Sequence, residues 1–195
     1  MIPQQKGRPV ATQPATIDHP YLIRKGIRVP SENRVRQCRE LLVLPVMDFK
    51  ANLTSLQFIA PNANKRLLSG GRKRDCFIPV QGDIANPSKV VIYEGWATGC
   101  TLFEDEPEST ILAAIDAGNL KPVAINARNR WPFAELVIAG DDDRKTPGNP
   151  GATKAKEAAI ASDALLAFPQ WPEGAPDTLT DFNDLVQWQR GAHHE

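Results

Sequence analysis

The second half of the chain alternates short, continuous apolar runs with segments that carry a helical pattern. The apolar runs predict strands at 89–94, 111–116, 135–140 and 164–168. The segments between them predict helices at 97–104, 120–130 and 151–163, and a last helix at 180–189 with Thr180 or Asp181 as its N-cap. Apolar strands that alternate with helices are typical of a parallel sheet with helices on both faces.

The first half has a different pattern, with short apolar or alternating runs separated by polar turns. These runs predict strands at 41–48, 53–59, 65–69 and 76–80 in a small, mainly antiparallel sheet, after a short helix at 19–26. Residues 1–17 are polar and rich in proline, which predicts a disordered leader. We therefore expect an α/β protein in three parts: the leader at 1–17, a basic N-terminal subdomain at 18–87, and the parallel-sheet domain at 88–190.

The net charge of zero conceals two halves of opposite sign. Residues 1–80 carry 14 Lys and Arg against 5 Asp and Glu, whereas residues 81–195 carry 9 against 18. A basic half joined to an acidic half suits a protein that binds a polyanion with one part and a metal ion with the other. The alternative is a chance imbalance between two solvated surfaces.

Cysteine and histidine are too few and too scattered to build a familiar site. Cys38, Cys76 and Cys100 form no CxxC pair, which argues against a disulfide framework and a zinc ribbon. The histidines are His19 and the two near the C-terminus, so we expect no zinc site and no histidine-based triad. No apolar run reaches membrane-spanning length and the first residues lack a signal-peptide pattern, so we expect a cytoplasmic protein without a membrane partner.

Acidic residues stand at the carboxyl ends of the first three strands predicted in the second half. Glu94 ends the first strand, Asp116 ends the second, and Asp141, Asp142 and Asp143 follow the third. Ligands of open α/β sheets bind at these strand ends. Successive aspartates repel one another, and a bound cation would offset the repulsion. In an extended segment Asp141 and Asp143 point to one side and Asp142 to the other.

Oxygen ligands alone favour a hard cation. We therefore expect Mg²⁺ or Mn²⁺ at Glu94, Asp141 and Asp143. Such an ion would polarise a phosphoryl oxygen and activate an attacking hydroxyl. The alternatives are that the acids cap helices or form a solvated junction between strand and loop.

Two motifs at these strand ends carry a family resemblance. VVIYEG (90–95) and LVIAGDDD (136–143) resemble the two motifs of the Toprim domain, which is shared by bacterial-type DNA primases, topoisomerases and some nucleases. The flanking segments HPYLIRKG (19–26), KRLLSGGRKRDCF (65–77), DAGNL (116–120) and TDFNDL (180–185) resemble the primase domains of phages, plasmids and integrated elements. The resemblance extends over residues 19–185.

The resemblance implies a role for each matching acid. Glu94 would be the general acid/base or a carboxylate beside the metal, and Asp141 and Asp143 would be metal ligands, while the role of Asp142 stays open. Supporting roles, at the metal or in contact with nucleotide, are implied for Asp116, Asn119, Asp181 and Asp184. Helix capping is the alternative for the three aspartates of that set.

A basic segment precedes the acidic half of the chain. Lys65, Arg66, Arg72, Lys73 and Arg74 surround Gly70 and Gly71. Glycines let backbone amides approach phosphates and the cations supply counter-charge, so we expect nucleic acid or triphosphate to bind here; a solvated strand edge is the alternative. Arg144 and Lys154 would neutralise a phosphate or, alternatively, form salt bridges to the acids.

The family resemblance implies the catalytic domain of a DNA primase. Such a domain makes RNA primers on a single-stranded DNA template from nucleoside triphosphates, with Mg²⁺ or Mn²⁺ and often with a replicative helicase as partner. No zinc-binding module or helicase segment is visible in this sequence, so we expect a fragment of a larger primase or primase-helicase, or a stand-alone domain. The alternatives are a Toprim-type DNA nuclease and a non-catalytic module that binds nucleic acid.

Overall fold

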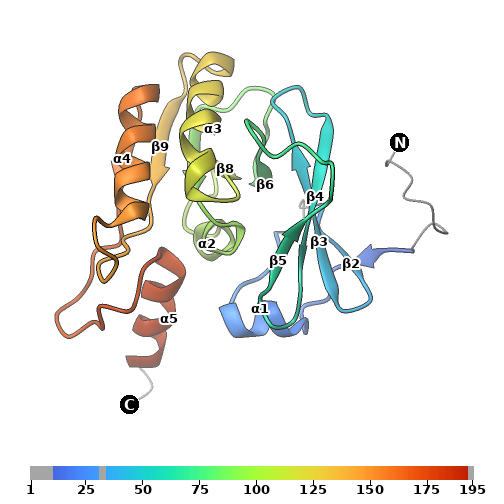
Figure 1. The fold of residues 1–195 in the computed structure, drawn as a ribbon, viewed down its shortest axis with the longest axis horizontal. Coiled ribbons are helices and arrows are strands. Elements are labelled where there is room, and N and C mark those ends of the chain that lie inside the picture. The colour runs from blue at the N-terminus through green and yellow to red at the C-terminus, as the bar shows by residue number, and fades with distance from the viewer. Residues whose placement is uncertain (1–10, 31–33, 193–195) are drawn as a thin grey trace.

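The computed structural model describes residues 11–30 and 34–192 and contains two five-stranded sheets side by side (Figure 1). The first sheet is antiparallel and follows chain order through β1 (Gln13–Pro14), β2 (Arg36–Cys38), β3 (Leu41–Met47), β4 (Leu53–Ile59) and β5 (Lys65–Leu67). The short helix α1 (Pro20–Lys25) begins after His19, whose ring accepts the Tyr21 amide, and ends at Gly26 in the left-handed conformation.

The second sheet has the strand order β10-β9-β7-β8-β6. Its bounds are β6 (Ile78–Gln81), β7 (Lys89–Tyr93), β8 (Thr110–Ala113), β9 (Glu135–Ala139) and β10 (Leu165–Ala167). Four of these strands are parallel, and β6 runs antiparallel to β8 at one edge. The predicted fold class is thereby confirmed: an α/β protein whose parallel sheet is preceded by a small antiparallel sheet.

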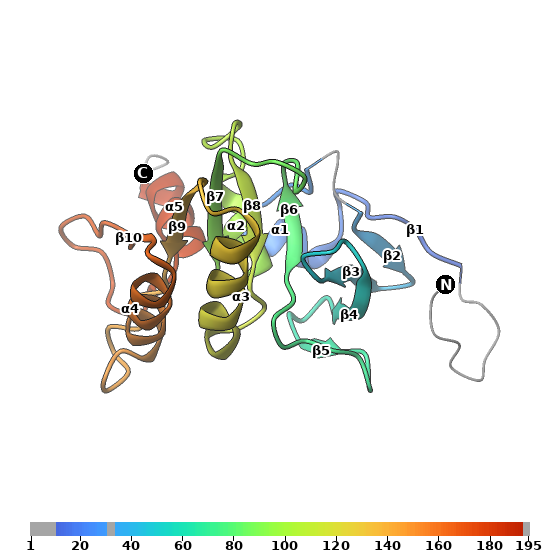
Figure 2. The same ribbon diagram turned by 90° about the horizontal axis from the view of Figure 1, so that it is seen from above.

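Helices cover both faces of the second sheet. Side chains alternate along a strand, and Val90 and Ile92 pack with α3 (Ala117–Arg130) and α4 (Pro150–Ser162), which lie side by side along one face (Figure 2). Val91 and Tyr93 face the other side, where α2 (Trp96–Leu102) packs and α5 (Phe182–Ala192) packs against α2. Within the described ranges, no helix combines the length and the apolarity needed to cross a bilayer.

The two sheets share one hydrophobic core. Leu44 and Val46 of β3 belong to the same buried cluster as Val91 and Tyr93 of β7. A backbone bridge also links the sheets, because Met47 and Phe77 exchange two N–H···O hydrogen bonds of 2.8 and 2.9 Å. These contacts hold the basic segment of the first sheet in a fixed position relative to the strand ends of the second.

Two segments differ from the sequence predictions. The run at 76–80 does form a strand, but β6 joins the second sheet instead of the first, because Ile78 pairs with Ala113 of β8. An apolar pattern predicts a strand without saying which sheet it joins. Part of the expected leader is also ordered, since Gln13 and Pro14 pair with β2. Residues 1–10 of the leader lie outside the described residues.

Candidate active site

The parallel strands bring the predicted acids to one edge of the second sheet. Tyr93 of β7 and Ala139 of β9 are partners in register, so Glu94 and the segment after Gly140 leave the sheet at the same level. Ala113 of β8 is level with Tyr93 on the other side, and Asp116 follows it. The carboxyl ends of three neighbouring strands therefore carry Glu94, Asp116 and Asp141–Asp143 to a common edge.

Asp141 is the most strongly perturbed carboxyl group of this edge. Burial and the negative charges of Glu94, Asp181 and Asp143 raise the pKa of Asp141 to about 8. Its Oδ1 atom is buried and has no hydrogen-bond partner within the described residues. A buried carboxylate oxygen without a donor is costly, and a cation at this point would remove the cost.

Glu94 lies in the same negative field. Burial and the charge of Asp143 raise the pKa of Glu94, whereas a hydrogen bond from the backbone N–H of Ala117 lowers it. Ala117 is the first residue of α3, so the positive end of that helix faces the Glu94 carboxylate. The balance leaves the pKa of Glu94 above its ordinary value, which is the direction that suits a general acid or base.

The start of α5 contributes two further acids. Asp181 Oδ1 accepts the backbone N–H of Asp184 at 2.8 Å, and Asp184 Oδ2 accepts the backbone N–H of Thr180 at 3.0 Å, so Asp181 is the N-cap, one of the two residues expected there. Burial and the charge of Asp184 raise the pKa of Asp181, while Thr98 donates a hydrogen bond to it at 3.2 Å. Asp181 thus caps a helix and also adds negative charge beside Asp141. Together, Glu94, Asp141, Asp143 and Asp181 form what we call the acidic centre.

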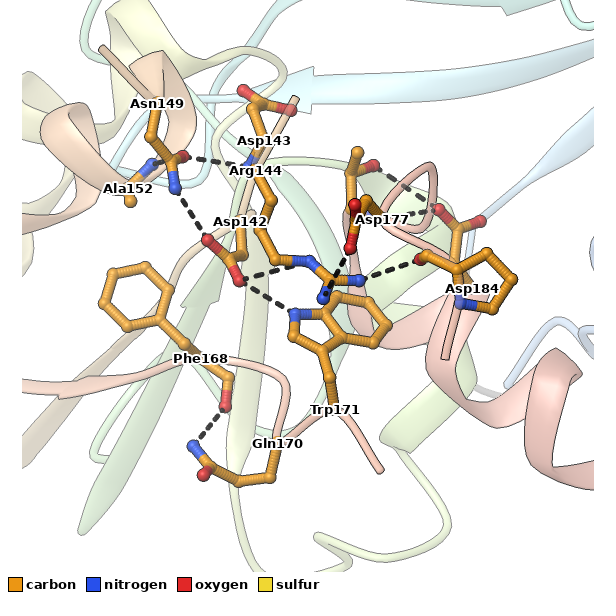
Figure 3. Close-up of polar contacts among 12 residues, drawn as sticks. Asp142, Asp143, Arg144, Asn149, Ala152, Phe168, Gln170, Trp171, Asp177 and Asp184 are labelled. Carbon is orange, nitrogen blue, oxygen red and sulfur yellow. Dashed lines mark hydrogen bonds and ion pairs between the residues drawn. The ribbon is translucent and has the colours of Figure 1, made fainter. Parts of the chain in front are cut away.

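Asp142 has a different set of partners from its neighbours (Figure 3). Its Oδ1 accepts the side-chain amide of Asn149 at 2.6 Å, and its Oδ2 accepts the indole N–H of Trp171 at 2.8 Å. The backbone N–H of Asp142 donates to Thr180 O at 2.7 Å. Asp142 therefore anchors the segment that leads to Asp181, a role for which the sequence offered no signal.

Arg144 also contacts the segment that leads to Asp181. Its guanidinium group lies 4.5 Å from the ring centroid of Trp171 and 3.6 Å from the Asp177 carboxylate, and it donates to Pro176 O at 2.8 Å (Figure 3). These contacts favour the salt-bridging alternative for Arg144. The hydrogen bond from Trp171 to Asp142 could not be foreseen from the sequence, because the two residues are 29 positions apart.

The backbone around the acidic centre is tightly constrained at two positions. A side chain at Gly151 would place its Cβ 2.9 Å from both Asp141 O and Asp143 Oδ2, so only glycine fits beside the two aspartates. The Gly151 N–H donates to Asp143 Oδ2 at 2.9 Å. Ile115 has a φ of +82°, a strained conformation for a β-branched residue, directly before Asp116.

The basic segment of residues 65–74 lies against this edge. Arg72 forms an ion pair with Asp48 at 3.0 Å, Lys73 forms one with Asp116, and Arg74 lies 3.9 Å from Asp75. The Asp116 carboxylate makes no capping hydrogen bond to α3. Asp116 therefore links the basic segment to the end of β8.

Asn119 holds the end of the basic segment in place. Its buried amide group donates to Cys76 O at 2.8 Å and Ala114 O at 2.8 Å, and its Oδ1 accepts the Asp75 N–H at 3.0 Å. It also donates to Lys73 O at 3.2 Å. With its donors and acceptor engaged, Asn119 is a positioning residue for the basic segment, which agrees with the supporting role among the two expected for it.

Lys65 connects the basic segment electrostatically to the acidic centre. Desolvation and repulsion from Lys25 lower the pKa of Lys65, whereas the charges of Asp181, Asp141 and Glu94 act in the opposite direction. Lys65 lies at an exposed position of β5. Arg66, next to it on β5, lies over the Phe58 ring at 5.4 Å. Lys154 on α4 pairs with Glu157 at 2.9 Å.

The donor set of the acidic centre fits a hard divalent cation. Only carboxylate oxygens are available, and the unpaired Asp141 Oδ1 is one of them. Within residues 11–30 and 34–192, no group of three or more His, Cys, Asp or Glu side chains is placed so that it could hold a metal ion. Mg²⁺ commonly takes only one or two carboxylates and completes its shell with water and substrate phosphate.

The fold and the acidic strand ends define a class of protein. Residues 89–192, more than half of the chain, match the family model of the Toprim domain, and the chain belongs to this family. Over 167 residues the chain is 38% identical to DNA primase TraC of Escherichia coli, covering 83% of this chain and 16% of that protein. The chain therefore spans about one sixth of the relative that it matches.

Solved structures agree with this assignment at the level of the fold. The primase fragment of the bacteriophage T7 primase-helicase protein matches with a TM-score of 0.65 and 15% identity, over 94% of this chain and 74% of that chain. The DnaG primase catalytic domain bound to single-stranded DNA matches with a TM-score of 0.53 and 17% identity, over 89% of this chain and 55% of that chain. Both similarities include the antiparallel sheet as well as the Toprim sheet, because they extend well beyond residues 89–192.

Proposed function

We propose that this chain is the catalytic domain of a DNA primase, which joins ribonucleotides into primers on single-stranded DNA. The observation that carries the proposal is the buried, unpaired Oδ1 of Asp141 between Glu94, Asp143 and Asp181 at the strand ends. The homology to DNA primase TraC over most of the chain supports synthesis as the reaction. Because that relative is much longer, we propose that the chain acts as part of a larger primase or primase-helicase.

Mg²⁺ or Mn²⁺ is the cofactor that the acidic centre fits. Glu94, Asp141 and Asp143 would hold it, with Asp181 beside them. When bound, the ion would polarise the phosphoryl group under attack and stabilise the leaving group. It would also compensate the mutual repulsion of these carboxylates, which now raises the pKa of Asp141 and of Glu94.

The chain's own side chains supply the remaining functions. Glu94, whose pKa is raised by burial and by Asp143, is the group that we propose takes the proton from the attacking hydroxyl. Lys65 supplies positive charge opposite the acidic centre, where the triphosphate of an incoming nucleotide would lie. Asp142, Arg144 and Trp171 keep the 169–180 segment, and with it Asp181, in position.

The proposed partners follow from the reaction. The template is single-stranded DNA and the substrates are nucleoside triphosphates, with a replicative helicase as a further partner that exposes the template. The solved structures of similar fold include a fragment of a primase-helicase protein and a primase domain bound to single-stranded DNA. The expected place of action is the cytoplasm, where replicating DNA lies.

The test is a synthesis assay with a single-stranded DNA template, all four ribonucleoside triphosphates and either Mg²⁺ or Mn²⁺. We expect extended RNA from the wild-type protein and none from Asp141→Asn/Asp143→Asn, with the double variant still folded by circular dichroism. Shortened DNA in place of RNA would establish the nuclease alternative. DNA binding that persists in both proteins without any product would favour the non-catalytic binding module.

A further inference from the structure

A cleft lies next to α3, beside the acidic centre. It has a volume of about 410 Å³ and lies between the end of the basic segment, the first turns of α3 and the first turns of α4. Three cationic side chains from three different elements line it, namely Arg74, Lys121 and Lys154. The sequence singled out Arg74 and Lys154 separately, but Lys121, inside a predicted helix, gave no signal.

The charge balance of the cleft favours an anion. Asp75 lies 3.9 Å from Arg74, and Glu157 lies 2.9 Å from Lys154, so two acids oppose three cations. Ala117 and Gly118, the first two residues of the 14-residue helix α3, also line the cleft. Their end of the helix carries the positive part of the helix dipole, which adds to the net positive charge.

The cleft is built on a rigid frame. Asn119 joins α3 to the segment that carries Arg74, through its hydrogen bonds to Lys73 O, Cys76 O and the Asp75 N–H. Asn119 is only 2% exposed, so these bonds are shielded from water. Arg74 is therefore attached to a segment that is fixed relative to Lys121, and a ligand would not have to order the cleft's backbone.

The cleft adjoins the acidic centre through Ala117 and Asp116. The Ala117 N–H is bonded to Glu94, and Ala117 is also part of the cleft wall. Asp116 directly precedes Ala117 in the chain, and its ion-pair partner Lys73 directly precedes Arg74. A group held in the cleft would therefore lie beside the acidic centre.

We propose that this cleft is a phosphate-binding subsite, in which Arg74, Lys121 and Lys154 hold a phosphate group of a nucleic-acid strand or of a nucleotide. The nature of the ligand rests on the proposed function, whereas the binding itself does not require catalysis. Phosphate oxygens match the three cations and the positive end of the α3 helix dipole. The two sources of phosphate differ in length, since a strand would continue beyond the cleft and a nucleotide would end in it.

The experiment measures binding without metal, so that the acidic centre does not contribute. Lys121→Gln and Lys154→Gln are compared with Lys156→Gln, an exposed lysine of α4 that does not line the cleft. Affinities for a single-stranded oligonucleotide and for ATP are determined in EDTA over a series of salt concentrations. Each cleft variant should lower the affinity for one probe about 3- to 10-fold and reduce the salt slope for the oligonucleotide by about 0.7 if the strand is bound there.

The outcomes separate the two sources and the two proposals. A loss confined to the oligonucleotide assigns the cleft to a strand, and a loss for ATP assigns it to a nucleotide. Cleft variants that behave like Lys156→Gln with both probes, or a wild-type protein that binds neither, would overturn the subsite. A protein that makes no primers but shows the selective loss of binding would refute the proposed function while leaving the subsite intact.

Discussion

In the basic segment of residues 65–74, three of the five cations lie within ion-pair distance of an acid, as Arg72 does with Asp48. In the acidic centre, by contrast, Asp141 keeps a buried oxygen without a partner, and its neighbours are further carboxylates. Both regions gather like charges, but only the basic segment compensates most of them within the protein. The difference is what the proposed cation site requires, because a cation would compensate the carboxylates that the chain itself leaves uncompensated.

Location explains why the two regions differ. The acidic centre lies where strand ends and helix starts converge, so burial raises the pKa of Asp141 and Glu94. The basic segment lies on an edge strand and an exposed turn, where the Arg74 side chain is 81% exposed. Exposed ion pairs contribute little to stability, so the cations of the segment stay available for exchange with phosphates.

The largest effect should come from Glu94→Gln in the acidic centre. The amide cannot take up a proton, so we expect primer synthesis to fall by about 100- to 10,000-fold while the fold is retained. The rate of primer extension measures the loss. Glu108→Gln, an exposed glutamate far from the strand ends in sequence, serves as the control and should retain activity. Equal rates for Glu94→Gln and the control would remove Glu94 from the reaction.

A change at Gly151 should weaken metal binding without removing any carboxylate. The Cβ of Gly151→Ala would lie 2.9 Å from Asp141 O and Asp143 Oδ2 and would push the two aspartates out of position. We expect Mn²⁺ affinity to fall about 10- to 100-fold, as for groups that orient metal ligands. Calorimetric titration measures the affinity, and Gly191→Ala, where no atom lies within 4 Å of the added Cβ, is the matched control. Unchanged Mn²⁺ affinity would show that the acidic centre is not the metal site.

At Asn119 of α3, which holds the end of the basic segment, substitution by alanine should lower the stability of the protein. The substitution leaves the Asp75 N–H and the carbonyls of Cys76 and Ala114 without their buried partner. We expect the free energy of unfolding to fall by about 1–3 kcal/mol, as measured by urea denaturation. Asn129→Ala, at an exposed position of the same helix, should lower the free energy of unfolding by about 0.5 kcal/mol at most. A similar small loss at Asn119 would contradict its positioning role.

A further effect is the pH dependence of the metal-free protein. The unfolded chain releases the Asp141 proton near its ordinary pKa of 3.8, whereas the folded protein keeps it to about 8. The folded state therefore binds more protons between these values, and this contribution to stability is lost as the pH rises from about 4 to 8. Asp141→Asn should be less sensitive to pH and, in EDTA, more stable than wild type at pH 8. If urea denaturation gives the same pH dependence of the free energy of unfolding for wild type and Asp141→Asn, then Asp141 titrates normally.

Several features of the fold and of the acidic centre could be predicted from the sequence alone. The continuous apolar runs before Glu94 and Asp141 were sufficient to predict parallel strands and acids at one edge, because strand ends in such sheets necessarily meet. The alternation of side chains correctly set Asp142 apart from Asp141 and Asp143. The sequence also narrowed the N-cap of α5 to Thr180 or Asp181, of which Asp181 is the cap, since capping depends on local sequence.

Only the tertiary structure decided which distant residues complete these local features. The bond from Trp171 to Asp142, the four hydrogen bonds of Asn119 and the cleft at Lys121 join segments far apart in the chain. The strand predicted at 76–80 forms as β6 (Ile78–Gln81), but its place beside β8 was not predicted. Local periodicity and capping determine the elements and the acids at their ends. Contacts across the sequence depend on packing in three dimensions, and these decide which charges are compensated and which remain free for a ligand.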